Sequence, residues 1–363
     1  MVPEHVDSVQ HQEQHSLRRS ERRHREEILS EPISPNGPVK VAITVDDFLQ
    51  WKMVPFPTGY SAERVVSSLT STFADFGITD CYAFFSTGPM EEDPSLREQV
   101  EAWCAAGHHV GNHTHNHASP DWVPASAFTD DIKLSEDYIG SFIEAAPVKY
   151  FRYPMDMWGA EADKVADIHH FLAKENYIPA PVSYWFYDAQ FVAPYWRAVE
   201  SADSDAAAWL VRTYAETAVD QLRRHAAVSR EMFGRDPIFI SVFHGTAVTS
   251  DSVRPMLEAL VAAGVEFVSL EEGMRDPLNA LPAPMHTRLF RNSTQKWADY
   301  LGVSLEGTPP LETLSRLEEV SPREGMSYED VFGAMRNHAA KEVGGTVAGG
   351  EFDWQSAVRP IHD

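Results

Sequence analysis

Short apolar runs and longer amphipathic stretches alternate along the central part of the chain. The runs have strand length, and the stretches repeat their apolar residues at helical spacing. The expected strands lie near 39–45, 80–85, 109–112, 149–152, 177–182, 237–243 and 265–269. The expected helices span 61–76, 94–106, 125–145, 160–174, 205–232 and 252–263. This order predicts parallel strands with helical crossovers, and by itself it fits a barrel and an open doubly wound sheet equally.

The two ends of the chain have a different composition. Residues 1–36 are rich in His, Glu, Arg and Gln and poor in apolar residues, which predicts a flexible arm. Residues 277–363 contain Pro, Gly and Glu between two expected helices, 291–301 and 328–338. The α/β part is therefore expected at 37–276, with a mainly helical C-terminal extension behind it. Trp354 in that extension is expected to dock on the body or on a neighbouring subunit, which leaves a homo-oligomer open.

Polar residues stand where four of the expected strands end. In a barrel of parallel strands, reacting groups lie at the carboxyl ends, on loops that follow different strands. We therefore expect these side chains to meet, although alone His244 is more typical of a structural histidine and Arg152 of an ordinary ion pair. The strand-end residues are Asp46 and Asp47, His113 and His117, Arg152, and His244.

Two of these strand ends indicate a metal site. His113 and His117 are four residues apart, so one helical turn would place both imidazoles on the same side. Two imidazoles and a carboxylate, with positions left for water, make a common hydrolytic metal site. The adjacent Asp46 and Asp47 suggest a division of labour, in which one carboxylate binds the metal and the other takes a proton from water.

The order of these motifs resembles that of the NodB-type polysaccharide deacetylases, carbohydrate esterase family 4. The resemblance runs from Val39 to Asp276. Five motifs carry it. They are T-F-D-D-G, here Thr44–Phe48; H-[ST]-x-x-H, here His113–His117; R-x-P, here Arg152–Pro154; an aspartate before tryptophan, here Asp188–Ala189; and a final leucine-histidine, here Phe243–His244.

The resemblance implies a distorted (β/α)7-type barrel and one divalent metal, with Zn²⁺ expected and Co²⁺ or Ni²⁺ as possible substitutes. It implies that Asp47, His113 and His117 bind this metal. The other implied roles are Asp46 as general base, Arg152 as the partner that keeps Asp46 ionised, His244 as general acid, and Asp188 as the group that stabilises its imidazolium form. The implied oxyanion donor is the main-chain N–H of Met155.

Some positions depart from the family pattern. Phe48 replaces a glycine, so its ring either lines the site or packs beneath it. Ala189 replaces a tryptophan that walls the pocket in the family. Aromatic residues crowd the loops after Asp47 and after the 177–182 strand, where they either contact substrate or pack on one another. Together with Met155, Tyr153 and Trp185 are the candidate substrate contacts.

Composition narrows the function further. The formal net charge of −24 argues against nucleic acid and anionic membranes as partners, since both favour a basic face. No apolar run is long enough for a membrane span, and the N-terminus shows no secretory signal, so we expect a cytoplasmic protein. Cys81 and Cys104 are expected to be small buried hydrophobes rather than metal or redox groups.

The expected function is a metal-dependent hydrolase that removes an N-acetyl group from an acetylated amino sugar or glycan. One alternative is an amidase or imidase for a small, non-carbohydrate acyl amide, which an intracellular location favours. The other is a catalytically silent carbohydrate-binding homologue. The presence of both aspartates, both histidines, Arg152 and His244 speaks against that last alternative.

Overall fold

The computed structural model describes residues 31–280 and 285–349. Most of the expected N-terminal arm, with its four histidines, lies outside the described residues, and so does Trp354. Among the described helices, none is both long and apolar enough to cross a lipid bilayer.

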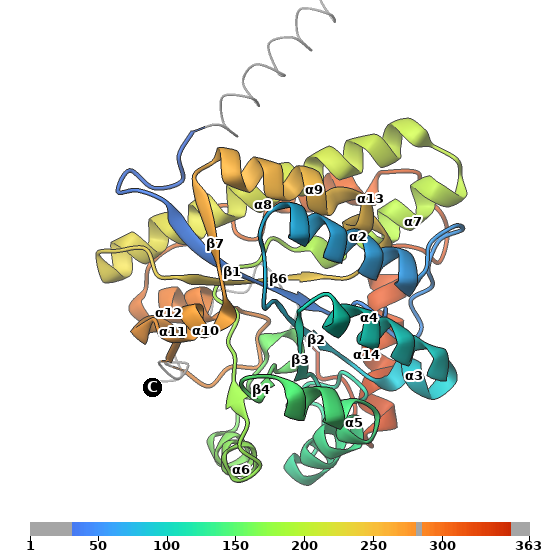
Figure 1. Ribbon diagram of the computed structural model, residues 1–363, viewed down its shortest axis with the longest axis vertical. Coiled ribbons are helices and arrows are strands. Elements are labelled where there is room, and N and C mark those ends of the chain that lie inside the picture. Colours follow the sequence, from blue (N-terminus) through green and yellow to red (C-terminus); the bar gives the residue numbers. More distant parts are fainter. Residues whose placement is uncertain (1–30, 281–284, 350–363) are drawn as a thin grey trace, which may run out of the picture.

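Seven parallel strands form one sheet at the centre of the molecule (Figure 1). Their order is β5-β4-β3-β2-β1-β6, and β7 pairs with the first half of β1. The strands are β1 (Val39–Asp46), β2 (Tyr82–Phe85), β3 (His109–Asn112), β4 (Tyr150–Phe151), β5 (Ile178–Pro179), β6 (Phe239–His244) and β7 (Val265–Val268). All seven lie where the hydrophobic pattern predicts them. The two-residue β4 and β5 are shorter than expected, although the Ala180 N–H just after β5 still donates to the Phe151 carbonyl at 2.8 Å.

The sheet curves back on itself because the chain after β5 crosses to β6. Tyr184 forms a parallel bridge with Ser241 of β6. The main-chain N–H groups of Ser183 and Tyr184 both donate to the carbonyl of Ile240, at 2.9 and 3.1 Å. The segment that follows one edge strand therefore pairs with the opposite edge strand. This closure confirms the distorted parallel barrel that the resemblance implies.

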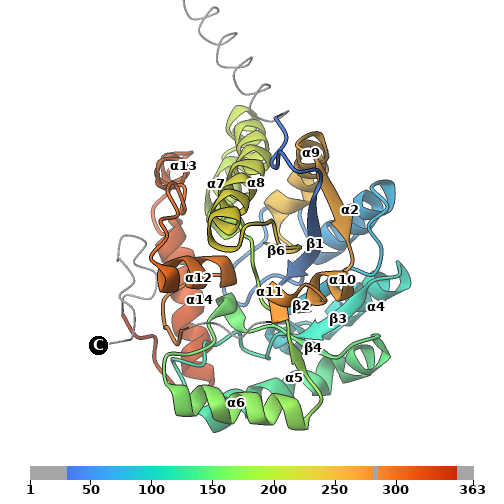
Figure 2. The same ribbon diagram turned by 90° about the vertical axis from the view of Figure 1, so that its left-hand side faces the viewer.

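Helices cover the outside of the barrel, with α2, α8 and α9 on one side and α5 and α6 on the other (Figures 1 and 2). The helices are α2 (Ala62–Asp75), α3 (Gly88–Glu92), α4 (Arg97–Ala105), α5 (Ala125–Ala145), α6 (Ala162–Lys174), α7 (Val192–Glu200), α8 (Ser204–Phe233), α9 (Ala247–Ala262), α10 (Leu270–Met274), α11 (Pro277–Ala280), α12 (Ser293–Leu301), α13 (Leu311–Glu318) and α14 (Tyr328–Glu342). Three short 3-10 helices are η1 (Pro94–Leu96), η2 (Pro154–Asp156) and η3 (Asp188–Phe191).

Helix α7, among other helices, is absent from the sequence prediction, and helix α9 starts earlier than predicted. Helix α7 was not predicted, because its aromatic-rich sequence resembles a packed loop. Helix α9 begins at Ala247, five residues before the predicted start, which was placed after a polar run. The polar groups of that run are satisfied within the helix end: Thr249 Oγ1 donates to the His244 carbonyl at 2.6 Å, and Ser250 Oγ donates to the Ala247 carbonyl at 2.8 Å.

Alternate residues of the central strands face two different cores. In β1, Val41, Ile43 and Val45 belong to the large core beneath the helices, whereas Ala42 belongs to the core inside the barrel. Successive side chains of a strand point to opposite faces, so Asp46 shares the inner face with Ala42. The helix-side core also contains Cys81, with the half-buried Cys104 against it, and both cysteines are free. Both therefore behave as the small hydrophobes expected.

The C-terminal extension packs on the barrel and shares its core. Leu317 of α13 and Val331, Phe332 and Met335 of α14 belong to the same buried cluster as the residues of β1 and α2. Helix α12 is fixed by hydrogen bonds to the segment that closes the barrel: Ser293 N–H donates to the Val182 carbonyl at 2.7 Å. The extension is thus an integral part of the fold.

Candidate active site

Asp46 and Asp47 diverge because the chain turns sharply where β1 ends. Asp46 is the last residue of the strand, and Asp47 has a left-handed backbone with φ of 51°. Positive φ is uncommon for residues other than glycine, and such strain gathers at functional sites. The same backbone conformation recurs in the other loops of this site, at Thr114, His117, Met155 and Asp156.

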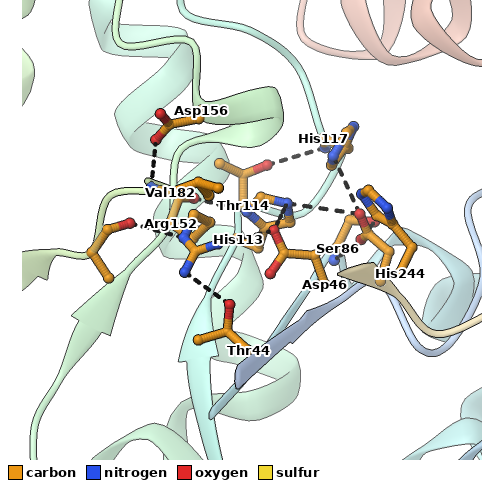
Figure 3. Close-up of polar contacts among 12 residues, drawn as sticks. Thr44, Asp46, Ser86, His113, Thr114, His117, Arg152, Asp156, Val182 and His244 are labelled. Atoms are coloured by element: carbon orange, nitrogen blue, oxygen red, sulfur yellow. Dashed lines mark hydrogen bonds and ion pairs between the residues drawn. The ribbon is translucent and has the colours of Figure 1, made fainter. Parts of the chain in front are cut away.

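Asp47, His113 and His117 form a buried cluster with the geometry of a metal site. One potential ligand atom from each residue lies within 4.8 Å of the other two. The Nε2 atoms of His117 and His113 are 3.3 and 3.7 Å from Asp47 Oδ2. Figure 3 shows both imidazoles turned toward Asp46 and His244. The three side chains that the resemblance assigns to the metal are therefore brought together.

The protonation of His113 makes this cluster fit a cation. Its Nδ1 lies 2.8 Å from the carbonyl oxygen of Arg152, which can only accept, so Nδ1 donates and Nε2 carries a lone pair. Burial lowers the pKa of His113 to about 3, which keeps the ring neutral. Nε2 is buried and has no hydrogen-bond partner among the described residues. Its lone pair thus faces the oxygen of Asp47, and a divalent cation between them would satisfy both.

Asp47 is oriented by three donors that the sequence analysis did not identify. The N–H and the hydroxyl of Ser86 donate to Oδ1 at 2.8 and 2.9 Å. The indole N–H of Trp51 donates to Oδ2 at 2.7 Å. Ser86 follows the last residue of β2, so its position at a strand end was a signal available in the sequence. These bonds fix the carboxylate that faces the two imidazoles.

The expectation that His113 and His117 share a helical turn was wrong. Residues 113–117 form a loop after β3, with positive φ at Thr114 and His117. The loop is held by side chains: Thr114 N–H donates to Asn112 Oδ1 at 2.9 Å, and His117 N–H donates to Thr114 Oγ1 at 3.0 Å. Polar side chains that bond to nearby main chain compete with helix formation, which explains the difference. The two imidazoles still converge.

Asp46 lies beside the metal cluster and is paired with Arg152. Both side chains are buried, and the guanidinium Nη1 is 3.5 Å from Asp46 Oδ2. Burial raises the pKa of Asp46 to about 7, although Arg152 and His244 act to lower it. Asp46 Oδ1 has no hydrogen-bond partner in the described part of the chain. Oδ2 therefore faces both the arginine and the metal cluster, whose His113 Nε2 is 3.8 Å away, and Oδ1 is buried.

Arg152 is held rigidly inside the barrel. Its Nε donates to the Ala180 carbonyl at 2.8 Å, and Nη2 donates to Thr44 Oγ1 at 3.1 Å (Figure 3). The guanidinium lies over the ring of Phe84, 4.6 Å from its centroid. That ring fits only because residue 111 is glycine, since a Cβ there would stand 2.2 Å from it. Gly111 on β3 thus leaves room for the Phe84 ring, which packs against the Arg152 guanidinium.

His244 stands next to Asp46 and is bonded to Asp188. The register of β1 and β6 places Asp46 directly opposite His244. His244 Nδ1 is 3.1 Å from both oxygens of Asp188, and its main-chain N–H donates to Asp188 Oδ2 at 2.7 Å. Burial lowers the pKa of His244, but the carboxylates of Asp188, Asp46 and Asp47 together outweigh it and raise that pKa to about 9. The structure thus brings Asp188 into contact with this imidazole.

Phe48 packs beneath the site rather than lining it. Its ring is fully buried, 4.7 Å from the ring of Phe85 and 5.4 Å from that of Trp103. The chain after β6 crosses directly over it, and a Cβ on Gly245 would lie 2.3 Å from the Cα of Phe48. The aromatic replacement therefore belongs to the core that supports the strand ends.

The turn at Met155 and Asp156 is tied to the C-terminal extension. Asp156 Oδ1 accepts hydrogen bonds from the N–H of Val182 and the indole of Trp158, at 3.3 and 2.9 Å. Lys296 of α12 donates to the Asp156 carbonyl at 2.6 Å and to Oδ2 at 3.1 Å. Both members of this ion pair are buried. The turn that carries the expected oxyanion donor is thus fixed by a lysine outside the motifs.

These groups surround a pocket of about 540 Å³, its open mouth included. The polar residues at its base include Asp46, His117 and His244. The remaining lining residues are Trp51, Met155, Asp156, Val182, Trp185, Ala189, Val242, Phe290, Tyr328, Phe332, Met335 and Arg336. Of the two aromatic loop clusters, Trp51 and Trp185 therefore contribute. Tyr153 does not line the pocket, because its ring is stacked between Phe128 and Trp158.

A sequence model of the polysaccharide deacetylase family matches residues 34–171. Residues 34–171 are therefore similar to the polysaccharide deacetylase family. The matched segment includes Asp46, Asp47, His113, His117 and Arg152. It ends before Asp188 and His244. No curated protein sequence matches the chain.

Three solved structures resemble the chain at low identity. A pseudoenzyme of carbohydrate esterase family 4 from Bacillus anthracis is 15% identical, with a TM-score of 0.41 over 66% of each chain. A family 4 carbohydrate esterase from Streptomyces lividans, in complex with acetate, is 20% identical, with a TM-score of 0.38 over 65% of this chain and 95% of that one. A polysaccharide deacetylase from Bacillus cereus is 17% identical, with a TM-score of 0.42 over 64% of this chain and 91% of that one.

Proposed function

We propose that this protein is a metal-dependent amide hydrolase that removes an N-acetyl group from an acetylated amine. The observation that carries the proposal is the convergence of two sets of groups at one pocket. The cluster of Asp47, His113 and His117 is suited to a metal. A separate carboxylate, Asp46, and a separate imidazole, His244, line the same pocket. Amide hydrolysis needs all of these: a polarised carbonyl, an activated water and a proton for the amine.

A divalent metal at Asp47, His113 and His117 would polarise the substrate carbonyl and lower the pKa of a water molecule. Two neutral nitrogens and one carboxylate suit Zn²⁺, and Co²⁺ or Ni²⁺ would substitute because such a site discriminates only modestly. The protein itself orients the ligand atoms, since the Arg152 carbonyl accepts a hydrogen bond from Nδ1 of His113 and the Ser86 N–H donates to Asp47. Preorganised ligands of this kind favour tight binding.

Asp46 is the proposed general base. Two carboxylates outside the metal cluster line the pocket, and Asp156 is paired with Lys296, whereas Asp46 lies beside the metal cluster with Oδ2 3.8 Å from His113 Nε2. Arg152 lies against the same oxygen and favours the ionised form, in which the carboxylate accepts a proton. The main-chain N–H of Met155, on the rigid turn beside the pocket, is the proposed donor to the oxyanion.

His244 is the proposed general acid. The oxygens of Asp188 accept a hydrogen bond from Nδ1, so Nδ1 carries a proton and Nε2 is the atom left to serve the pocket. Proton delivery from Nε2 to the amine nitrogen lets that nitrogen leave as a neutral amine. Asp188 stabilises the charged imidazolium before this transfer.

The test is an acetate-release assay with the purified full-length chain. We expect hydrolysis of acetamido substrates that is abolished by a chelator and restored by Zn²⁺, Co²⁺ or Ni²⁺. The double variant His113→Ala/His117→Ala is expected to lose both tight metal binding and turnover, because a single carboxylate remains. Metal content is measured alongside activity. Full metal stoichiometry in the double variant, or chelator-resistant hydrolysis by the native chain, contradicts the proposal.

A further inference from the structure

Helix α14 of the C-terminal extension forms a roof over the pocket. Tyr328, Phe332, Met335 and Arg336, all on this helix, line the pocket together with the reacting groups at its base. The ring of Phe332 is 5.1 Å from that of Trp51, the residue bonded to Asp47. Figure 1 shows α14 on the side of the molecule toward which β1 and β6 run. The carboxyl ends of these strands are therefore covered by a helix.

The roof extends past the pocket toward the metal cluster. Met335, His338 and Ala339 of α14 line a second hollow, which also borders His117 and Trp51. An extended polymer needs an open groove that continues on both sides of the reacting bond. On this flank of the metal cluster, α14 forms one wall of the hollow, so a groove that continued here would be bounded by the helix.

The helix is fixed in this position. Its first turn has a reciprocal capping box between Ser327 and Asp330. Phe332 is 3% exposed and Met335 is 6% exposed, and both belong to the main core of the barrel. Arg336 is held by Glu329, whose two oxygens each lie 2.7 Å from Nη2. Because α14 shares the main core, the roof is a stably packed element rather than a mobile segment.

The wall between base and roof is apolar. The apolar residues that line it are Val182, Trp185, Ala189, Val242, Phe290, Phe332 and Met335. Its two charged members away from the base are already engaged, Asp156 by Lys296 and Arg336 by Glu329, which leaves the Tyr328 hydroxyl and the Trp185 indole N–H as the other polar side-chain groups. A sugar ring in this space would bury hydroxyl groups against carbon atoms, and a buried hydroxyl without a hydrogen bond is costly. An apolar ring or alkyl group meets no such penalty.

We propose that the substrate is a small N-acetyl amide whose nitrogen carries an apolar group of about the size of one ring, and that α14 excludes residues within a glycan polymer. This substrate class rests on the proposed amide hydrolase function. The pocket is bounded by Trp185 on one side and by Phe332 and Met335 of the roof on the other, so its occupant must be small. The carbonyl would lie over the metal cluster and Asp46, with the apolar group between Trp185 and Phe332.

The first experiment compares three acetamides with the metal-loaded protein: N-benzylacetamide, N-acetylglucosamine and the soluble chitin pentamer. All three release an amine on an sp³ carbon, so the comparison concerns mainly the pocket. We expect kcat/KM for N-benzylacetamide to exceed that for either sugar by about 100-fold, the discrimination that an apolar pocket reaches. An equal or higher value for the monosaccharide or the pentamer overturns the inference.

The second experiment changes the roof. Phe332→Ala is expected to lower kcat/KM for N-benzylacetamide by about tenfold, chiefly through KM, because the ring wall is lost. Phe332→Leu preserves the core volume better and is expected to show a smaller loss in the same direction. Asn337→Ala, at an exposed position on the same helix, is the matched control and should leave all three substrates unchanged. An unchanged KM in both Phe332 variants contradicts the proposed contact.

The outcomes separate the two levels of the proposal. If no acetamide releases acetate with Zn²⁺, Co²⁺ or Ni²⁺, the hydrolase function fails and the substrate class fails with it. If acetate is released in a chelator-sensitive manner but a sugar is preferred, the hydrolase function stands and only the role of α14 is overturned.

Discussion

The segment matched by the family, residues 34–171, and the segment behind it, 172–349, build the site in different ways. The first supplies the metal cluster, Asp46 and Arg152 from loops directly after β1, β3 and β4. The second supplies Asp188 and His244, together with most of the wall and the whole roof. Chemistry that depends on short motifs is therefore concentrated in the first segment. The space around the substrate is made by the second.

The two segments also depend differently on tertiary structure. Asp47, His113 and His117 meet through the successive pairing of β1, β2 and β3. Asp188 reaches His244 only because the chain after β5 crosses the barrel and pairs with β6. The contact between Asp188 and His244 therefore forms only when the barrel closes. The metal cluster, in contrast, forms when β1, β2 and β3 pair.

The largest expected effect is in the first segment. Asp46→Asn should keep the metal but lower kcat by about 10³- to 10⁴-fold, because an amide cannot accept the proton of water. Metal content and turnover are measured on the same samples, with Asp47→Asn as the reciprocal variant that should lose metal. If Asp46→Asn instead lost the metal and kept its activity in metal-supplemented buffer, the roles of the two aspartates would be reversed.

A smaller and more selective effect is expected in the second segment. His244→Ala should lower hydrolysis of acetamides by about 10²- to 10³-fold, because their amine leaves slowly without a proton. Activated aryl acetates, whose leaving group needs no proton, should lose much less, and both rates are measured with the same metal-loaded variant. Equal losses on the two substrates would give His244 a structural or binding role.

The smallest expected effect on turnover tests how the two segments are joined. Lys296→Met leaves Asp156 buried without its cation, which should cost about 3–5 kcal/mol of folding stability. Displacement of the Met155 turn should lower kcat by about tenfold with little change in KM. Urea denaturation and steady-state kinetics measure these two effects. Lys341→Met, at an exposed position on α14, is the control, and equal behaviour of the two variants would exclude a positioning role for Lys296.

The sequence predicted the elements that show a regular hydrophobic pattern, which are the strands and most of the long helices. Strands such as β1 and β6 are buried apolar runs with polar residues at their ends, so both the strands and Asp46 and His244 could be identified. The conformation of residues 113–117 could not, because a loop held by Thr114 and Asn112 depends on side-chain hydrogen bonds rather than on periodicity. The pattern still identified both histidines, since the spacing holds in either conformation.

The roof and the buried ion pair could not be predicted for a different reason. Helix α14 was expected from its periodicity, but nothing in the sequence shows that it packs over β1 and β6. Lys296 resembles a solvated helical lysine in the sequence, and only the fold brings it to Asp156. Contacts between elements distant in sequence depend on how the barrel closes, which local patterns do not encode.

The pairing of Asp46 with His244 across β1 and β6 has a consequence for how this protein can diverge. Adjacent strands lie about 4.8 Å apart wherever they pair, so the separation of the base and the acid is set by the backbone ladder and not by any loop. Loops over the barrel can lengthen, shorten or change sequence while this spacing persists. New substrate specificities can thus evolve through changes in the wall and roof of the pocket alone. A one-residue shift in the β1–β6 register, in contrast, would turn His244 to the opposite face and remove the acid in a single step.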